Sequence, residues 1–196
     1  MAALAAVGAL SGCGSDATTT AGPPAPLPPA PLPPAPVPGP VPPPFVQPAL
    51  EQSFAGKLSS TLNVALSDYN VNGEALKLRS YNNQITGPTL RVRPGDKLKV
   101  KLINNLAATA DQNQMPANEN TPHAFNNTNL HTHGLHVSPS GFSDNIFVDI
   151  QPGQEWPYEY DIPLDHPPGT FWYHPHKHGS SSMQLFSGMC GALIVQ

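Results

Sequence analysis

Two pairs of histidines, each pair separated by one residue, are the part of this sequence best suited to chemistry. The first pair is His131 and His133, and the second is His174 and His176. Residues i and i+2 of a β-strand point to the same face, so each pair would present two imidazoles side by side. If the two strands are neighbours, four imidazoles converge on one small volume. Neutral imidazole binds copper, zinc, iron or nickel, so the spacing predicts a metal site without naming the metal.

The segments around these pairs have the pattern of short β-strands. Apolar and polar residues alternate with a period of two, and turn residues such as Pro94-Gly95-Asp96 separate the runs. Strands are predicted at residues 61–66, 90–93, 98–103, 156–160, 170–173 and 192–195. No long segment has helical periodicity, so the sequence predicts an all-β sandwich. The polar, Asn-rich residues 111–129 are predicted to form a long loop before the first pair.

Composition limits the fold to one domain of ordinary size. The chain has 196 residues and 26 prolines, and most of the prolines fall between Pro23 and Pro48. Such a tract cannot bury a core, so the predicted domain is 49–196 and 14–48 is a disordered Pro-rich linker. Net charge is −4 and 11% of the residues are charged, which excludes a basic surface for nucleic acid. No apolar stretch reaches the roughly 20 residues that span a bilayer.

The first residues resemble an export signal. An apolar, Ala-rich segment runs into Leu10-Ser11-Gly12-Cys13, which resembles the lipobox of bacterial lipoproteins, although the segment lacks the usual Lys or Arg. We therefore predict a signal peptide over 1–13 and a membrane anchor through lipidated Cys13. The protein would be exported and periplasmic or on the cell surface. The linker would serve either as a polyproline II spacer or as a linker with no spacing role.

The residues around the histidines resemble those of one family. Residues 129–136 (Asn-Leu-His-Thr-His-Gly-Leu-His) and 169–176 (Gly-Thr-Phe-Trp-Tyr-His-Pro-His), with Gly179, resemble copper motifs of multicopper oxidases. Residues 87–96 and 188–195 resemble that family's early strand pair and its domain-closing strand. The resemblance covers residues 62–195 and is closest to the bacterial laccase-like branch. It implies a cupredoxin-like Greek-key β-sandwich.

The resemblance also implies roles for individual residues. In this family, type 2 and type 3 coppers form a trinuclear site that reduces O2 to water. By this resemblance His131 would bind the type 2 copper, while His133, His174 and His176 would bind type 3 coppers. Asp144 lies where the family keeps an acid that delivers protons, although a surface or turn role is the alternative for this residue.

The remaining residues of interest have plainer interpretations. His136 and His178 either orient ligands or lie in solvent, and His123 and His166 are interpreted as ordinary surface residues. Trp172 and Phe171 are expected to pack the sandwich and shield the site. No histidine flanks Cys190, so it does not match a type 1 copper site and is interpreted as a buried core thiol.

The resemblance therefore implies an incomplete enzyme. The family's trinuclear site needs eight histidines and an electron-entering type 1 copper, and these residues supply four histidines alone. Either this is the front part of a full oxidase, or a separate chain supplies the other half. In both cases a C-terminal multicopper oxidase domain or a second chain would be the partner. The alternative is a non-catalytic exported lipoprotein that stores or delivers copper. The isolated chain is expected to be inactive towards phenols.

Overall fold

The computed structural model of the chain describes residues 45–110 and 113–196. Residues Phe45–Gln196 form one compact unit. The predicted signal peptide with Cys13, and the linker as far as residue 44, lie outside the described residues, so lipidation and export stay predictions. In the part of the chain that is described, no helix is long and apolar enough to cross a membrane.

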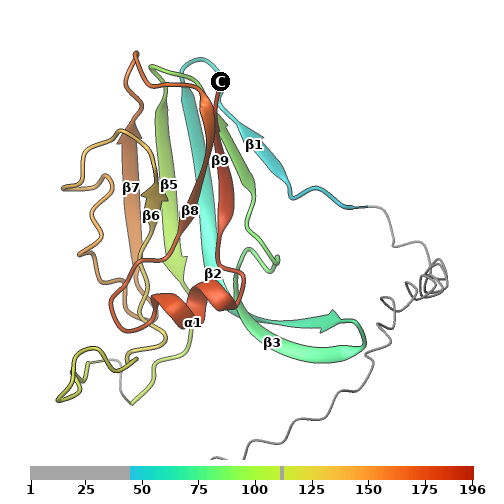
Figure 1. The fold of residues 1–196 in the computed structure, drawn as a ribbon, viewed down its shortest axis with the longest axis vertical. Helices are drawn as coiled ribbons and strands as arrows, with labels where there is room; N and C mark the ends of the chain where they lie inside the picture. The colour runs from blue at the N-terminus through green and yellow to red at the C-terminus, as the bar shows by residue number, and fades with distance from the viewer. Residues whose placement is uncertain (1–44, 111–112) are drawn as a thin grey trace, which may run out of the picture. The chain divides into compact units, whose positions relative to one another are not determined.

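In the part of the chain that the structure describes, nine strands form two sheets. Figure 1 shows their arrangement. The five-stranded sheet has the order β1 (Leu50–Gln52), β4 (Thr89–Val92), β9 (Gly191–Val195), β8 (Gly169–His174) and β6 (His131–His133). The four-stranded sheet has the order β3 (Glu74–Tyr81), β2 (Lys57–Val71), β5 (Lys97–Asn104) and β7 (Glu155–Asp161). One short helix, α1 (Ser181–Phe186), lies between β8 and β9 in the sequence.

The core lies between the two sheets and follows the alternation seen in the sequence. In β5, Leu98, Val100 and Leu102 are buried, and β4 and β9 contribute buried residues from the other sheet. The lysines that alternate with these leucines lie on the outer face of the sheet. There each pairs with an acid of the antiparallel neighbour β7, as Lys101 does with Glu155 at 2.8 Å. The prediction of an all-β sandwich is confirmed.

Five of the six predicted strands coincide with an observed strand to within about one residue, a normal uncertainty for strand ends. The sixth, 61–66, is only the middle of the longer strand β2. The pattern missed the short edge strand β1 and the longer strand β3, which pairs with the far half of β2. The first four residues of β3 are exposed and only its end, at Ser80 and Tyr81, is buried. Most of the strand therefore has no buried face that would impose an alternating pattern. Its turn is formed by Asn72 and Gly73, both with positive φ, as a two-residue hairpin requires.

The first histidine pair and the start of the second lie on neighbouring strands, as predicted. Strand β6 forms one edge of the five-stranded sheet and pairs antiparallel with β8, so that His131 lies opposite His174. Within β6 the alternation is clear, because Thr132 is buried while His133 on the other face is exposed. Strand pairing therefore places the histidines of two distant segments on one face.

Candidate metal centre

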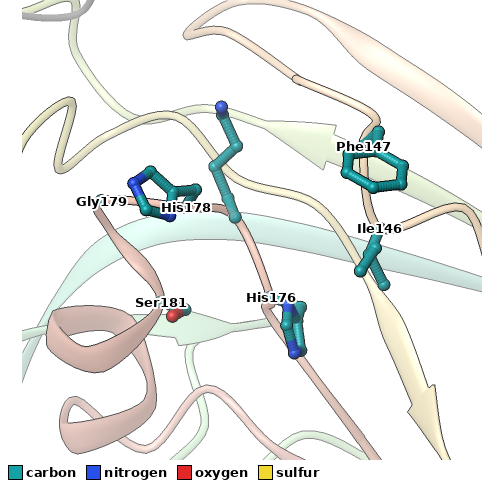
Figure 2. Close-up of a pocket in the computed structure, with 7 residues that line it drawn as sticks. Ile146, Phe147, His176, His178, Gly179 and Ser181 are labelled. Carbon is teal, nitrogen blue, oxygen red and sulfur yellow. The ribbon is translucent and has the colours of Figure 1, made fainter. Parts of the chain in front are cut away.

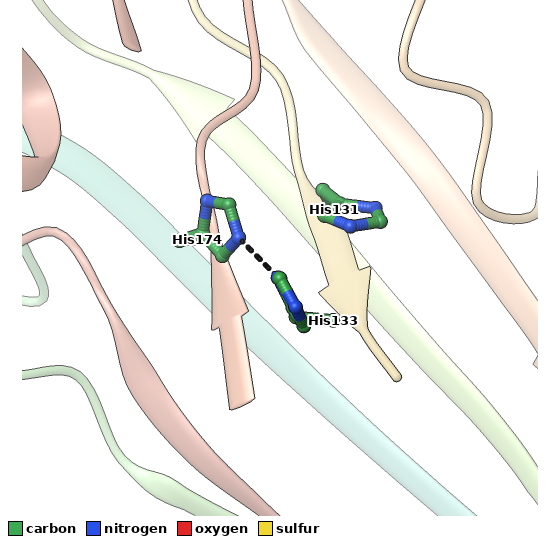
Figure 3. A group of neighbouring side chains, drawn as sticks. All are labelled: His131, His133 and His174. Atoms are coloured by element: carbon green, nitrogen blue, oxygen red, sulfur yellow. Dashed lines mark hydrogen bonds between the residues drawn. The ribbon is translucent and has the colours of Figure 1, made fainter. Parts of the chain in front are cut away.

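Three imidazoles converge where β6 and β8 meet. One ring nitrogen from each of His131, His133 and His174 can be chosen so that all three atoms lie within 4.8 Å of one another. Nδ1 of His133 lies 3.3 Å from Nε2 of His174, and Figure 3 shows these rings facing each other across the two strands. A single metal ion with bonds of about 2 Å can bind nitrogens at such a separation.

The hydrogen bond at the other nitrogen of His174 fixes its tautomer. Nδ1 lies 2.9 Å from the carbonyl oxygen of Pro175, which can only accept, so Nδ1 carries the proton and Nε2 has a free lone pair. Burial lowers the pKa of His174, and the neighbouring histidines lower it further, against the opposing effect of the Pro175 carbonyl. Both effects favour the neutral imidazole, which is the form that binds a metal.

Asp144 orients His131. Its Oδ2 lies 2.9 Å from Nδ1 of His131, and its Oδ1 accepts the backbone N–H of Thr132 at 2.7 Å. When one ring nitrogen donates its N–H to a carboxylate, the other nitrogen keeps the lone pair that binds a metal. The structure thus brings Asp144 to the predicted site through a contact with a histidine, whereas its role in proton delivery stays a prediction.

His176 lies apart from the group of three. It lies beyond the end of the strand and outside the group whose nitrogens meet within 4.8 Å. Its ring is nevertheless close, with its centroid 5.1 Å from that of His131 and 6.0 Å from that of His174. Strand β8 ends at His174, so the expectation that both members of the second pair lie in one extended strand is wrong for His176. Pro175 lacks the N–H that would continue the ladder. Figure 2 shows His176 in a cavity with Ile146 and Phe147.

Phe171 and Trp172, the neighbouring aromatic residues of β8, have different roles. Phe171 packs against the core, as predicted. Trp172 instead stacks on two of the histidines, with ring centroids 4.1 Å from His174 and 5.1 Å from His133. Because these contacts restrict the rotation of both imidazoles, Trp172 stabilises the arrangement of the group of three.

His166 was interpreted as a surface residue, and this is wrong. Only 3% of it is exposed, and its Nε2 accepts the backbone N–H of His136 at 3.0 Å. Its ring also contacts Phe171 edge-to-face. The side chain is buried because it closes the turn that follows β6, a contact between segments about thirty residues apart that local composition does not reveal.

His123 was also interpreted as a surface residue and is buried, with 7% exposed. Its ring packs on Gly179, where any Cβ would lie within 2.8 Å of it, and its Nδ1 lies 2.8 Å from the carbonyl of Thr121. His178 is exposed, and its Nε2 lies 2.7 Å from the carbonyl of Glu119. These two histidines therefore fasten the predicted long loop to the segment after the second pair.

The end of that loop is more ordered than its composition suggested. Asn126, Asn127, Thr128 and Asn129 are all buried. Gln184 of α1, also buried, accepts a hydrogen bond from Thr128 and donates to the carbonyl of Asn127. The sequence analysis gave none of these residues a role. The available signal was the position of Asn129, two residues before the first histidine and on the same face of an extended chain.

Cys190 differs from the prediction of a buried core thiol, because it is half-buried and lines an apolar groove with Trp172 and Pro48. Partial burial raises the pKa of its thiol. It is a free cysteine, so among the described residues it takes part in no disulfide.

Comparison with known proteins settles the family. The profile of a family described as multicopper oxidase matches residues 63–115 and 118–196. This chain belongs to the multicopper oxidase family. Over 116 residues it is 34% identical to the multicopper oxidase mco of Staphylococcus haemolyticus, an alignment that covers 59% of this chain and 21% of that protein. The chain spans about a fifth of the length of the curated relatives it matches.

Solved multicopper oxidases share the fold. A multicopper oxidase from Campylobacter jejuni described as a metallo-oxidase matches with a TM-score of 0.57 and 26% identity, over 78% of this chain and 30% of that one. One from Pediococcus acidilactici matches with a TM-score of 0.60 and 19% identity, over 78% and 29% of the two chains. The predicted cupredoxin-like sandwich, the N-terminal domain of this multicopper oxidase family, is confirmed.

The donor set of the described residues fits copper. Imidazole nitrogens are good copper ligands, and His174 is held as a neutral tautomer with a free nitrogen. The carboxylate of Asp144 lies behind His131 as an orienting partner. Copper is also the metal after which the family is named, so the site is a candidate copper centre.

Proposed function

We propose that this chain contributes four imidazoles to the type 2 and type 3 copper site of a multicopper oxidase. His131 would serve the type 2 copper, and His133, His174 and His176 the type 3 coppers. The observation that carries the proposal is the convergence of His131, His133 and His174 within 4.8 Å. Copper bound there would supply the redox chemistry by which O2 is reduced to water.

The protein residues around the site have separate tasks in this proposal. Asp144 holds the proton on Nδ1 of His131 and thereby keeps Nε2 free for metal. After taking up a proton from solvent, the same carboxylate would pass it towards the site, which is the role that the family resemblance implies for Asp144. Trp172 shields one side of His174 from water.

The exposure of the site supports the need for a partner. His133 and His176 are exposed, so further ligands can approach them from outside the domain. Next to His176 lies a cavity of about 320 Å³ whose rim includes Phe147, which is 87% exposed. An apolar side chain beside an unfinished metal site is typical of a surface that another domain covers. We therefore assign the remaining ligands to a C-terminal multicopper oxidase domain or a second chain.

Copper loading of the full chain tests this proposal. Native mass spectrometry should find a monomer with one or two coppers, and His131→Ala and His174→Ala should each lose copper. Oxygen uptake with a phenolic substrate should stay at background. Unchanged copper content in both variants would exclude the site. Turnover by the chain alone would exclude the need for a partner.

The second candidate is a copper carrier without catalysis, favoured by the exposure of His133 and His176. The two candidates differ in what happens on mixing with a domain that carries the missing ligands. If the chain is part of a multicopper oxidase, mixing should give a complex with three coppers at the interface and should restore oxygen uptake. A carrier should instead pass its copper on and show no oxygen uptake.

A further inference from the structure

One buried amide links the two histidine pairs. Asn129 has no exposed surface and lies two residues before His131. Its Oδ1 accepts the backbone N–H of His176 at 2.7 Å. Its Nδ2 donates to the carbonyl of Ile146 at 2.7 Å and to that of Val148 at 3.3 Å. The side chain therefore joins three segments that are distant in the sequence.

His176 depends on such a contact because the sheet does not hold it. The β6–β8 ladder ends at the pair of His131 and His174, two residues before His176. The intervening Pro175 has no N–H to donate. The N–H of His176 is thus the first donor after the strand, and Asn129 provides its acceptor.

The Nδ2 group of Asn129 donates to the loop that carries Asp144. Ile146 follows Asp144 by two residues, and Asp144 in turn contacts His131 and Thr132. Asp144 is held directly by His131 and Thr132, so the support of His131 should survive the loss of Asn129, whereas the N–H of His176 would lose its acceptor.

We infer that Asn129 is a positioning residue that sets the place of His176 relative to the other three histidines. The inference rests on the proposed function, since it assumes that His176 is a copper ligand. Asn129 touches no metal and acts through the backbone N–H of His176. Removal of its side chain would leave the three converging histidines on their strands and release the fourth.

The experiment measures how much His176 contributes to copper binding, with and without Asn129. Copper(II) affinity of the full chain is measured by competition with a chromophoric chelator. The contribution of His176 is the ratio of the affinities of wild type and His176→Ala. We expect a ratio of about tenfold or more, since even outer partners of ligands change metal affinity by about 10–100-fold. In the Asn129→Ala background this ratio should fall towards one.

Asn104 offers a matched control. It is equally buried, and its Nδ2 donates to the carbonyls of Asn126 and Ile150 at 2.7 and 2.9 Å. None of its partners is a histidine. Asn104→Ala should lower the melting temperature as Asn129→Ala does but leave the His176 ratio unchanged. If Asn129→Ala does not fold, Asn129→Thr replaces it. A hydroxyl is smaller than the amide and cannot both accept from the His176 N–H and donate to the carbonyl of Ile146.

The outcomes separate the two hypotheses. A His176 ratio that persists in the Asn129 variant, or that falls equally in the Asn104 variant, would overturn the positioning role alone. A ratio of one in the wild-type background would show that His176 is not a ligand, and would overturn the inference together with that part of the proposed function. Electron paramagnetic resonance of the copper(II) forms should show the same change in Asn129→Ala as in His176→Ala, and a different spectrum would contradict the inference.

Discussion

The two histidine pairs have the same spacing but are held by different means. His131 and His133 lie in β6, where the strand ladder fixes the backbone and Asp144 fixes the first ring. His174 ends β8, and His176 lies beyond the strand, with its backbone N–H held by the side chain of Asn129. Equal sequence spacing therefore does not mean equal support, because the backbone N–H of His176 is bound by one side chain rather than by the strand ladder.

The largest expected effect is the loss of a histidine from the group of three. His131→Ala removes a nitrogen from the group and leaves Asp144 without its partner. We expect copper affinity to fall by more than the roughly 10–100-fold typical of outer partners, and to fall less in His176→Ala. Isothermal titration of each variant checks this order. A larger loss for His176 would reverse the comparison between the pairs.

Asp144→Asn should have the next largest effect. The amide can still accept the Thr132 N–H through its oxygen, but its NH2 group would face Nδ1 of His131 and favour the other tautomer. The nitrogen needed for metal would then carry the proton, so copper affinity should fall by about 10–100-fold. Asp149→Asn is the control, because Asp149 is an exposed acid that lies 3.6 Å from Lys177. Equal affinities in the two variants would contradict the orienting role.

Gly179→Ala tests the segment after the second pair. This glycine has φ +89°, and an added Cβ would meet the ring of His123 at 2.6 Å. Gly153 has a similar φ of +81° but open space around it. Both variants should lose about 1 kcal/mol from the positive φ, and Gly179→Ala should lose about 1–3 kcal/mol more from overpacking. Chemical denaturation measures the free energy of unfolding of each variant. Equal losses would show that the His123 ring moves aside at no measurable cost.

The smallest expected effect is on the pH dependence of stability. Burial lowers the pKa of His174 in the folded chain, so the unfolded chain binds the proton more tightly. The free energy of unfolding of the copper-free protein should therefore fall as the pH drops below about 6.5, the ordinary histidine value, towards the lowered pKa. His174→Asn should show a smaller decline over this range. If the variant lost as much stability as the wild type over this range, the decline would arise from a group other than His174.

Much of the fold could be predicted because half-buried strands leave an alternating pattern. Strands with an alternating buried face, such as β5, were found in this way, whereas β3 was missed because its first four residues are all exposed. The three converging histidines followed from the same rule, since period-two spacing and strand pairing place them on one face.

The rest of the site could not be predicted because it depends on contacts between distant segments. His166 closes the turn after β6 and Asn129 binds the backbone of His176, and in both cases the partner is thirty or more residues away. The same holds for His123 against Gly179. A polar residue in an irregular segment looks solvated in the sequence, and only its distant partner explains its burial.

The alternation within β6 also limits how this domain can evolve. Thr132 points into the core while His131 and His133 point out of it. A shift of register by one residue exchanges the two faces of a strand. A mutation that inserts or deletes a single codon within β6 would turn a histidine into the core and carry Thr132 to the metal face. Lineages that keep the site can therefore vary the loops on either side of these three codons far more freely than the length of the strand itself.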